Sequence, residues 1–197
     1  MFRLPIHSAP FFLIATLATA ALSLAASAQD ALAPAVTATS VTHLNYKTSK
    51  SFEAVTASIE KQLGKFDPSV GRLFSASPLD GAAIEEKMHA MEGSSGLMIF
   101  AVRDHGQLLA LKGKHGQARQ YEIGNPLVAL EMTQHDLRAG EYAPLRMYVY
   151  VGEDNLTHVD YDLPSSLFSR FHSKDVDEVG KSLDQKLAKL VANALRD

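Results

Sequence analysis

Two short segments in the C-terminal half constrain the fold of this chain more than any other feature. Residues 145–151 read LRMYVYV and residues 156–163 read LTHVDYDL, and apolar and polar side chains alternate along both. Alternation with a period of two is typical of strands that bury one face. The GEDN between them favours a hairpin turn. We therefore expect an antiparallel sheet whose apolar face is covered by a second layer.

The length of the hairpin loop decides which side chains share a face, because a slip of one residue inverts a strand. A two-residue loop would place Met147 opposite Asp160 and so mix apolar and charged groups. A three-residue loop at 153–155 separates them, and it requires Asn155 to adopt the left-handed conformation. We predict the three-residue loop. The cross-strand pairs expected on the polar face are Arg146–Asp162, Tyr148–Asp160 and Tyr150–His158.

The periodicity of apolar residues predicts the remaining elements. The C-terminal helix is the clearest of them, and Asp175 with Glu178 resembles a capping box at its start. Strands are expected at 41–46, 97–102 and 118–123, and helices at 51–66, 79–92, 127–137 and from 175 onwards. Residues 105–113 could form a strand or a short helix, and the spacing of their leucines favours the helix. This order, β-α-β-β-β-β-α with extra short helices, predicts the α+β class: a two-layer sandwich with helices on one face of a mostly antiparallel sheet.

The first residues of the chain predict export. Arg3 precedes an apolar segment from Phe11 to Ala26, and Ala-Ser-Ala at 26–28 suits signal peptidase, so residues 1–28 are expected to be a signal peptide cleaved after Ala28. A retained membrane anchor is the alternative, but the segment is shorter than the roughly 20 residues needed to span a bilayer. Residues 29–40 are expected to form a flexible leader. The predicted location is periplasmic or secreted.

The composition narrows the possible chemistry. The chain has no cysteine and a formal net charge of −3. Thiolate metal sites, cysteine nucleophiles and disulfides are therefore excluded, and without a dense basic patch we expect no nucleic-acid partner. No membrane partner is expected after cleavage of the signal peptide.

The polar face of the hairpin is one candidate functional surface. Its two tyrosines offer flat contacts and its arginine suits an anion. Two interpretations stay open: a solvated outer face, or a surface for a small ligand or a protein partner, a second copy of the chain included. The candidate residues are Arg146, Tyr148, Tyr150, His158, Asp160 and Asp162.

Four segments of the chain resemble the family named domain of unknown function 302 (DUF302). They are residues 51–63, 100–113, 121–126 and 143–167. The resemblance implies one domain over residues 41–197 with an inserted segment at about 67–96, and a β-α-β4-α fold like that of TATA-binding protein. It implies no established reaction. The residues that carry the family pattern or lie beside it are Asp104, His105, Gly124, Asn125, Pro126, His135, Asp136, Pro144, Leu145, Arg146, Tyr161 and Pro164.

Gly-Asn-Pro at 124–126 is expected to be a structural corner. Gly124 would let the chain turn, and Pro126 would hold Asn125 extended before opening a helix. That helix would carry His135 and Asp136, which either approach Arg146 or Tyr161 or face water.

The preferred functional hypothesis is a non-enzymatic module that binds a small ligand or a protein, with no cofactor. The alternative is a metal- or haem-dependent redox or hydrolytic protein that uses His105 and His135. Histidine and carboxylates are the only metal ligands left in a cysteine-free chain, but no H-E-x-x-H occurs.

Overall fold

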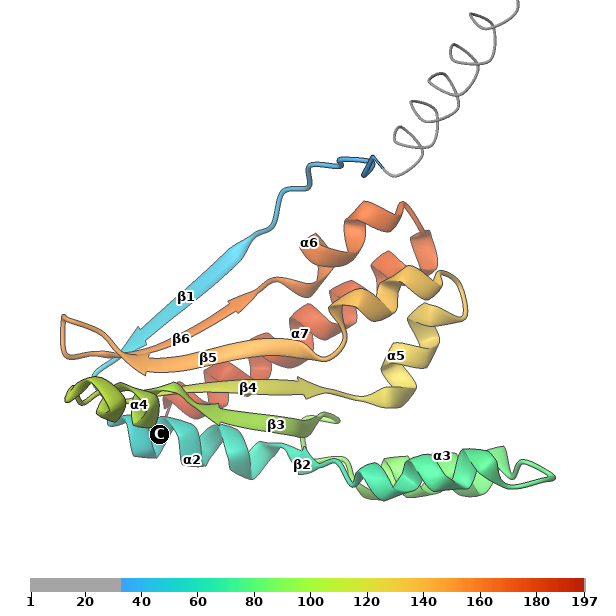
Figure 1. Ribbon diagram of the computed structural model, residues 1–197, viewed down its shortest axis with the longest axis horizontal. Coiled ribbons are helices and arrows are strands. Elements are labelled where there is room, and N and C mark those ends of the chain that lie inside the picture. Colours follow the sequence, from blue (N-terminus) through green and yellow to red (C-terminus); the bar gives the residue numbers. More distant parts are fainter. Residues whose placement is uncertain (1–32, 197) are drawn as a thin grey trace, which may run out of the picture. The chain divides into compact units, whose positions relative to one another are not determined.

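The computed structural model describes residues 33–196, and its centre is one six-stranded sheet (Figure 1). The strands lie in the order β1-β6-β5-β4-β3-β2. All neighbours are antiparallel except β2 and β3, which are parallel. The predicted α+β class is confirmed. The strands are β1 (His43–Thr48), β2 (Gly64–Lys65), β3 (Met98–Asp104), β4 (Ala118–Gly124), β5 (Leu145–Val151) and β6 (Thr157–Asp162).

Two long helices, α2 and α7, cover one face of this sheet (Figure 1). Their apolar faces and that of the sheet form the main core, in which Val55, Tyr121 and Leu187 have almost no exposed surface. The α-helices are α2 (Phe52–Gln62), α3 (Gly81–Ala90), α4 (His105–Leu108), α5 (Pro126–Thr133), α6 (Pro164–Phe168) and α7 (Lys174–Arg196); the 3-10 helices are η1 (Pro68–Ser75), η2 (Leu109–Lys112), η3 (Leu137–Tyr142) and η4 (Ser169–Phe171). No helix in residues 33–196 is long and apolar enough to cross a membrane.

The predicted hairpin register is confirmed. Tyr148 pairs with Asp160 and Tyr150 with His158. The loop is closed by a hydrogen bond from the Gly152 N–H to the Leu156 carbonyl, which leaves residues 153–155 as the loop. Asn155 has a φ of 58°, the left-handed conformation that this loop needs. The apolar side chains of β5 and β6 consequently all point into the core.

Three predicted helix boundaries are wrong. The helix expected at 127–137 ends at Thr133, so it does not carry His135 and Asp136. The C-terminal helix begins after Ser173, whose hydroxyl lies 3.5 Å from the Val176 N–H, so the Asp175 capping box does not form. The first helix ends at Gln62, not at residue 66. Its N-cap is Ser51, with the hydroxyl accepting from the Ala54 N–H. Beyond Gln62 the chain becomes extended and adds β2 to the edge of the sheet.

A close backbone crossing explains why the first helix ends there. A Cβ on Gly64 would lie 1.7 Å from the Met91 carbonyl oxygen, and a Cβ on Gly93 would lie 2.3 Å from the Gly64 nitrogen. Only glycine lets the two segments approach this closely. The crossing holds the start and the end of the segment at 67–96 together at the sheet edge.

The segment at 67–96 has a small apolar cluster of its own. Val70 of η1 packs with Ile84 and Met88 of α3, and Phe66 and Leu127 contact this cluster from outside the segment. Since Phe66 follows β2 and Leu127 belongs to α5, the cluster joins the segment to the end of the sheet where α5 begins.

Candidate functional site

The Gly-Asn-Pro segment forms the corner between β4 and α5. Asn125 is extended, with a φ of −145° and a ψ of 124°, and is the N-cap of α5. Its side-chain oxygen accepts from the Leu127 N–H at 2.9 Å, and its Nδ2 donates to Glu92 Oε1 at 2.8 Å and to the Gly96 carbonyl at 3.0 Å. The predicted structural role is therefore confirmed for Asn125 and Pro126.

Gly124 has a different role from the one expected. Its φ is not in the left-handed region, so the turn does not need a glycine. A Cβ at this position would lie 3.5 Å from Phe100 Cε2 and 3.8 Å from Pro144 Cβ, at ordinary contact distance. These two neighbours line a pocket beside the corner, as does Gly124 itself. The missing side chain therefore leaves space in a cavity.

That cavity has a volume of about 290 Å³ and lies between the ends of β3, β4 and β5 and the helices α5, α6 and α7. Its walls are apolar, and it is the candidate ligand site of this protein. The lining residues are Phe66, Phe100, Gly124, Asn125, Pro126, Val128, Ala129, Met132, Tyr142, Ala143, Pro144, Leu145, Phe168 and Leu183.

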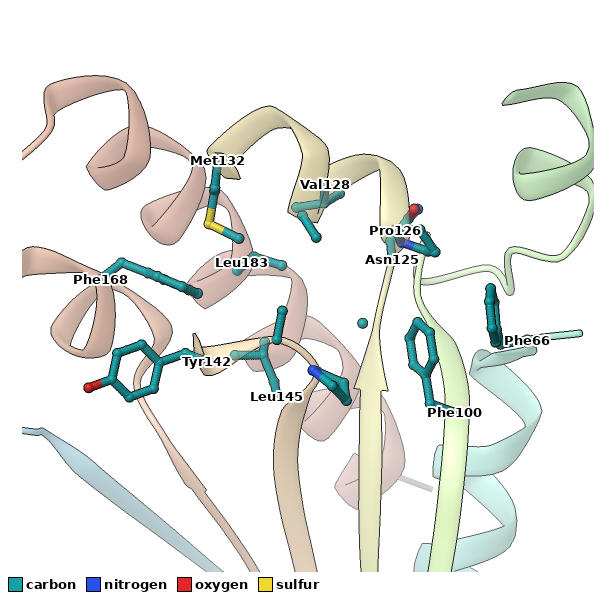
Figure 2. A pocket seen from close by; sticks show the side chains of 14 residues that line it. Phe66, Phe100, Asn125, Pro126, Val128, Met132, Tyr142, Leu145, Phe168 and Leu183 are labelled. Carbon is teal, nitrogen blue, oxygen red and sulfur yellow. The ribbon is translucent and has the colours of Figure 1, made fainter. Parts of the chain in front are cut away.

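Two aromatic pairs flank the cavity on opposite sides (Figure 2). On one side the ring centroids of Phe66 and Phe100 are 4.6 Å apart with an interplanar angle of 32°. On the other side Tyr142 and Phe168 meet edge to face, at 6.1 Å and 88°. Figure 2 also shows Met132 on α5, above the cavity. A ligand in this space would contact aromatic rings from both sides.

The polar side chains in the cavity wall already have partners. All three hydrogen bonds of Asn125 go to other parts of the chain. The Tyr142 hydroxyl accepts from Arg170 Nη1 at 2.7 Å and points away from the cavity in Figure 2. Pro126 and Pro144 have no N–H to offer. The lining includes no lysine, arginine, histidine or carboxylate, so the wall offers shape and apolar surface rather than charge.

The polar face of the hairpin, the other candidate surface, forms a network with β1. Asn45 Nδ2 donates to His158 Nδ1 at 3.1 Å, and His158 Nε2 donates to Asp154 at 2.8 Å. Asn45 also bonds Asp160, and Lys47 Nζ lies 3.0 Å from Asp154. His158, followed by Lys47, holds the pKa of the Asp154 carboxyl well below its usual range. His158 is only 6% exposed, so it is a buried member of the network.

The predicted partners Arg146 and Asp162 lie one step beyond the Met147–Tyr161 pair of the confirmed register, but their side chains form no ion pair. Asp162 Oδ1 instead lies 2.9 Å from His43 Nδ1, and Arg146 makes no ion pair within residues 33–196. The reason is that β1 pairs with β6 on the side away from β5, and its His43 lies directly opposite Asp162. Hydrogen bonding to Asp162 raises the pKa of His43. This contact therefore contributes most to stability below pH 6.5 and is lost as the pH rises through the raised pKa.

The aromatic residues of this face form a continuous row. Tyr150 stacks on His158 at 4.7 Å, Tyr148 lies 5.6 Å from Tyr150, and the His105 ring meets Tyr148 edge-on at 5.8 Å. His105 reaches this row from the start of α4. Its Nε2 is buried and has no hydrogen-bond partner in the described part of the chain. The rings of this row are thus packed against one another.

The structure places His105 and His135 apart. His105 follows β3 at the end where β4 begins, whereas His135 follows α5 beyond the other end of β4. His135 Nδ1 lies 3.6 Å from Asp175. Among residues 33–196 no group of three or more histidine, aspartate or glutamate side chains is arranged to hold a metal ion.

The remaining family-pattern residues act within the fold. Asp104 caps α4 by accepting from the Gln107 N–H at 2.8 Å, and Asp136 caps η3 and pairs with Arg138. Asp136 thus reaches neither Arg146 nor Tyr161. Tyr161 is 2% exposed and stacks on Tyr46, and burial raises the pKa of its phenol.

Comparison with known proteins identifies the family. The sequence profile described as Domain of unknown function DUF302 matches residues 75–194. The chain belongs to the DUF302 family. The match includes the pocket residues from Phe100 to Leu183, and three of the four segments that carry the resemblance lie within it.

A solved DUF302 structure has the same fold. The crystal structure of an uncharacterized conserved DUF302 protein from Bacillus stearothermophilus matches with a TM-score of 0.54 and 14% identity, covering 77% of this chain and 97% of that one. At this identity the likeness supports the fold alone. A search of curated proteins gives no match.

Sequence reasoning missed the cavity itself. Its aromatic walls come from residues far apart in the chain, such as Phe66, Phe100 and Phe168. In the local sequence pattern, each of these phenylalanines looks like an ordinary residue of the hydrophobic core. The available signal was the two prolines, Pro126 and Pro144, which mark element ends that the hairpin topology brings together.

Proposed function

We propose that this DUF302 protein is an exported small-ligand-binding protein, and that its site is the apolar cavity beside the Gly-Asn-Pro corner. The observation that carries the proposal is a cavity of about 290 Å³ whose walls are mainly apolar and whose polar side chains are paired before any ligand arrives. Binding is favourable because a ligand that covers the apolar wall removes it from water.

The cavity is preferred over the polar sheet face for a physical reason. Most charged groups on that face pair with one another: Asp154 with Lys47, and Asp162 with His43. A ligand that bound them would have to displace these contacts. The cavity requires no such exchange, because its wall contains no ion pair to break.

Export is part of the same proposal. It rests on the basic, apolar and small-residue pattern of residues 1–28, which lie outside the described residues. The mass of protein purified from the periplasm or the medium tests it. We expect a chain that begins at Gln29, and a full-length chain retained in the cell would contradict this part of the proposal.

Binding is tested with N-phenyl-1-naphthylamine, a neutral dye whose fluorescence rises in apolar surroundings. We expect a saturable rise on titration into the wild-type protein. Gly124→Ala should weaken the dye's affinity and Gly124→Val should weaken it further, by about tenfold or more, because each added methyl group takes space from the cavity.

Gly71 provides the matched control. A Cβ there meets nothing within 4 Å, so Gly71→Ala and Gly71→Val leave the cavity as it is. Circular dichroism verifies that all four variants are folded. If the wild-type protein gives no saturable signal, or if the Gly124 and Gly71 variants bind the dye equally well, the cavity is not the binding site.

A further inference from the structure

The walls of the cavity also restrict the kind of ligand. We infer that the natural ligand, or the part of it that enters, is neutral and contains an aromatic ring system of about two fused rings. This inference rests on the proposed function, since it describes the occupant of the same cavity.

The first argument is electrostatic. None of the lining residues carries a full charge at neutral pH, and the one phenol, Tyr142, already accepts a hydrogen bond from Arg170. An anionic or cationic group placed inside would lose its hydration without gaining a partner, which is costly. Arg170 does not supply that partner, because it also pairs with Glu141 and lies 5.3 Å from the centroid of the Phe171 ring.

The second argument is size. A protein cavity of about 150 Å³ is enough to hold benzene. This cavity, at about 290 Å³, has roughly twice that volume. It therefore suits a two-ring aromatic group or an aliphatic group of similar bulk.

The third argument favours the aromatic group over the aliphatic one. Phe66 and Phe100 form one flank and Tyr142 and Phe168 the other (Figure 2). Aromatic rings in stacked or edge-to-face contact gain about 0.5–1.5 kcal/mol beyond the burial of their area. A flat ring system makes this contact with whichever flank it lies against, whereas an alkyl chain makes it with neither flank.

Competition against N-phenyl-1-naphthylamine tests the ligand class with three small probes. Two of them, 2-naphthol and 2-naphthoate, share the same ring system and differ in charge at neutral pH. The third, 1-decanol, is neutral and aliphatic. We expect 2-naphthol to displace the dye at a concentration at least tenfold lower than 2-naphthoate needs, and also lower than 1-decanol needs.

The competition experiment distinguishes the charge of the ligand from its aromatic character. If 2-naphthoate displaces the dye as well as 2-naphthol does, the requirement for neutrality is overturned. If 1-decanol is the stronger competitor, the aromatic preference is overturned. In both cases dye binding that Gly124→Val weakens would still support the cavity as the site. Failure of the dye to bind the wild-type protein would instead remove the proposed function.

Discussion

At the residue scale, Asn125 connects three parts of the molecule through one side chain. Its oxygen caps α5, and its Nδ2 holds Glu92 and the Gly96 carbonyl, both at the end of the segment that begins near residue 67. The residue is 7% exposed, so these bonds are shielded from water. The cavity wall consequently depends on an amide at this position, since a capping oxygen alone does not hold the segment.

The Asn125→Asp variant separates these two roles. An aspartate keeps the capping oxygen but replaces the donor with a carboxylate oxygen that faces Glu92 and the Gly96 carbonyl. Losing these two partly buried hydrogen bonds, with a carboxylate then facing Glu92, costs about 1–3 kcal/mol. We expect urea unfolding at pH 7 to show a loss of stability of that size. The control is Asn155→Asp in the exposed hairpin loop; equal stability of the two variants would contradict this role for Asn125.

At the scale of elements, the hairpin shows what the sequence can predict and the helix ends show what it cannot. The loop and register at 151–157 follow from local rules: side chains alternate with a period of two, and the loop needs one left-handed residue. The end of α2 depends instead on a contact with the backbone of Gly93, about thirty residues away in the chain. Arg146 and Asp162 form no ion pair for a similar reason, because β1 brings His43 to Asp162 from a distant part of the sequence.

The hairpin loop gives a test at this scale. Asn155 has a φ of 58°, and a β-branched residue in this conformation costs roughly 1–2 kcal/mol. We expect Asn155→Val to lower the free energy of unfolding by about that amount and Asn155→Gly to change it little. Glu153→Val, at a loop position without a positive φ, is the matched control. A Glu153→Val loss as large as that of Asn155→Val would argue against the three-residue loop.

At the scale of the whole molecule, the cavity is a product of topology. The sheet brings the ends of β3, β4 and β5 together, and α5, α6 and α7 close over them. Phe66 then reaches the cavity from beyond β2, so the crossing of Gly64 with Gly93 positions one of its walls. The fold class was predictable because it depends on the order of elements. The cavity was not, because it depends on how closely the elements pack.

Methyl NMR on protein labelled with ¹³C at the methionine methyl groups tests the central claim most directly. Met132 lines the cavity, whereas Met88 belongs to the separate cluster of η1 and α3 and Met147 lies in the main core outside the cavity lining. Titration with 2-naphthol should shift the Met132 signal, because an aromatic ring beside a methyl group changes its magnetic environment, and should leave the other two nearly unchanged. A saturable shift of Met88 or Met147 with Met132 unmoved would contradict the account.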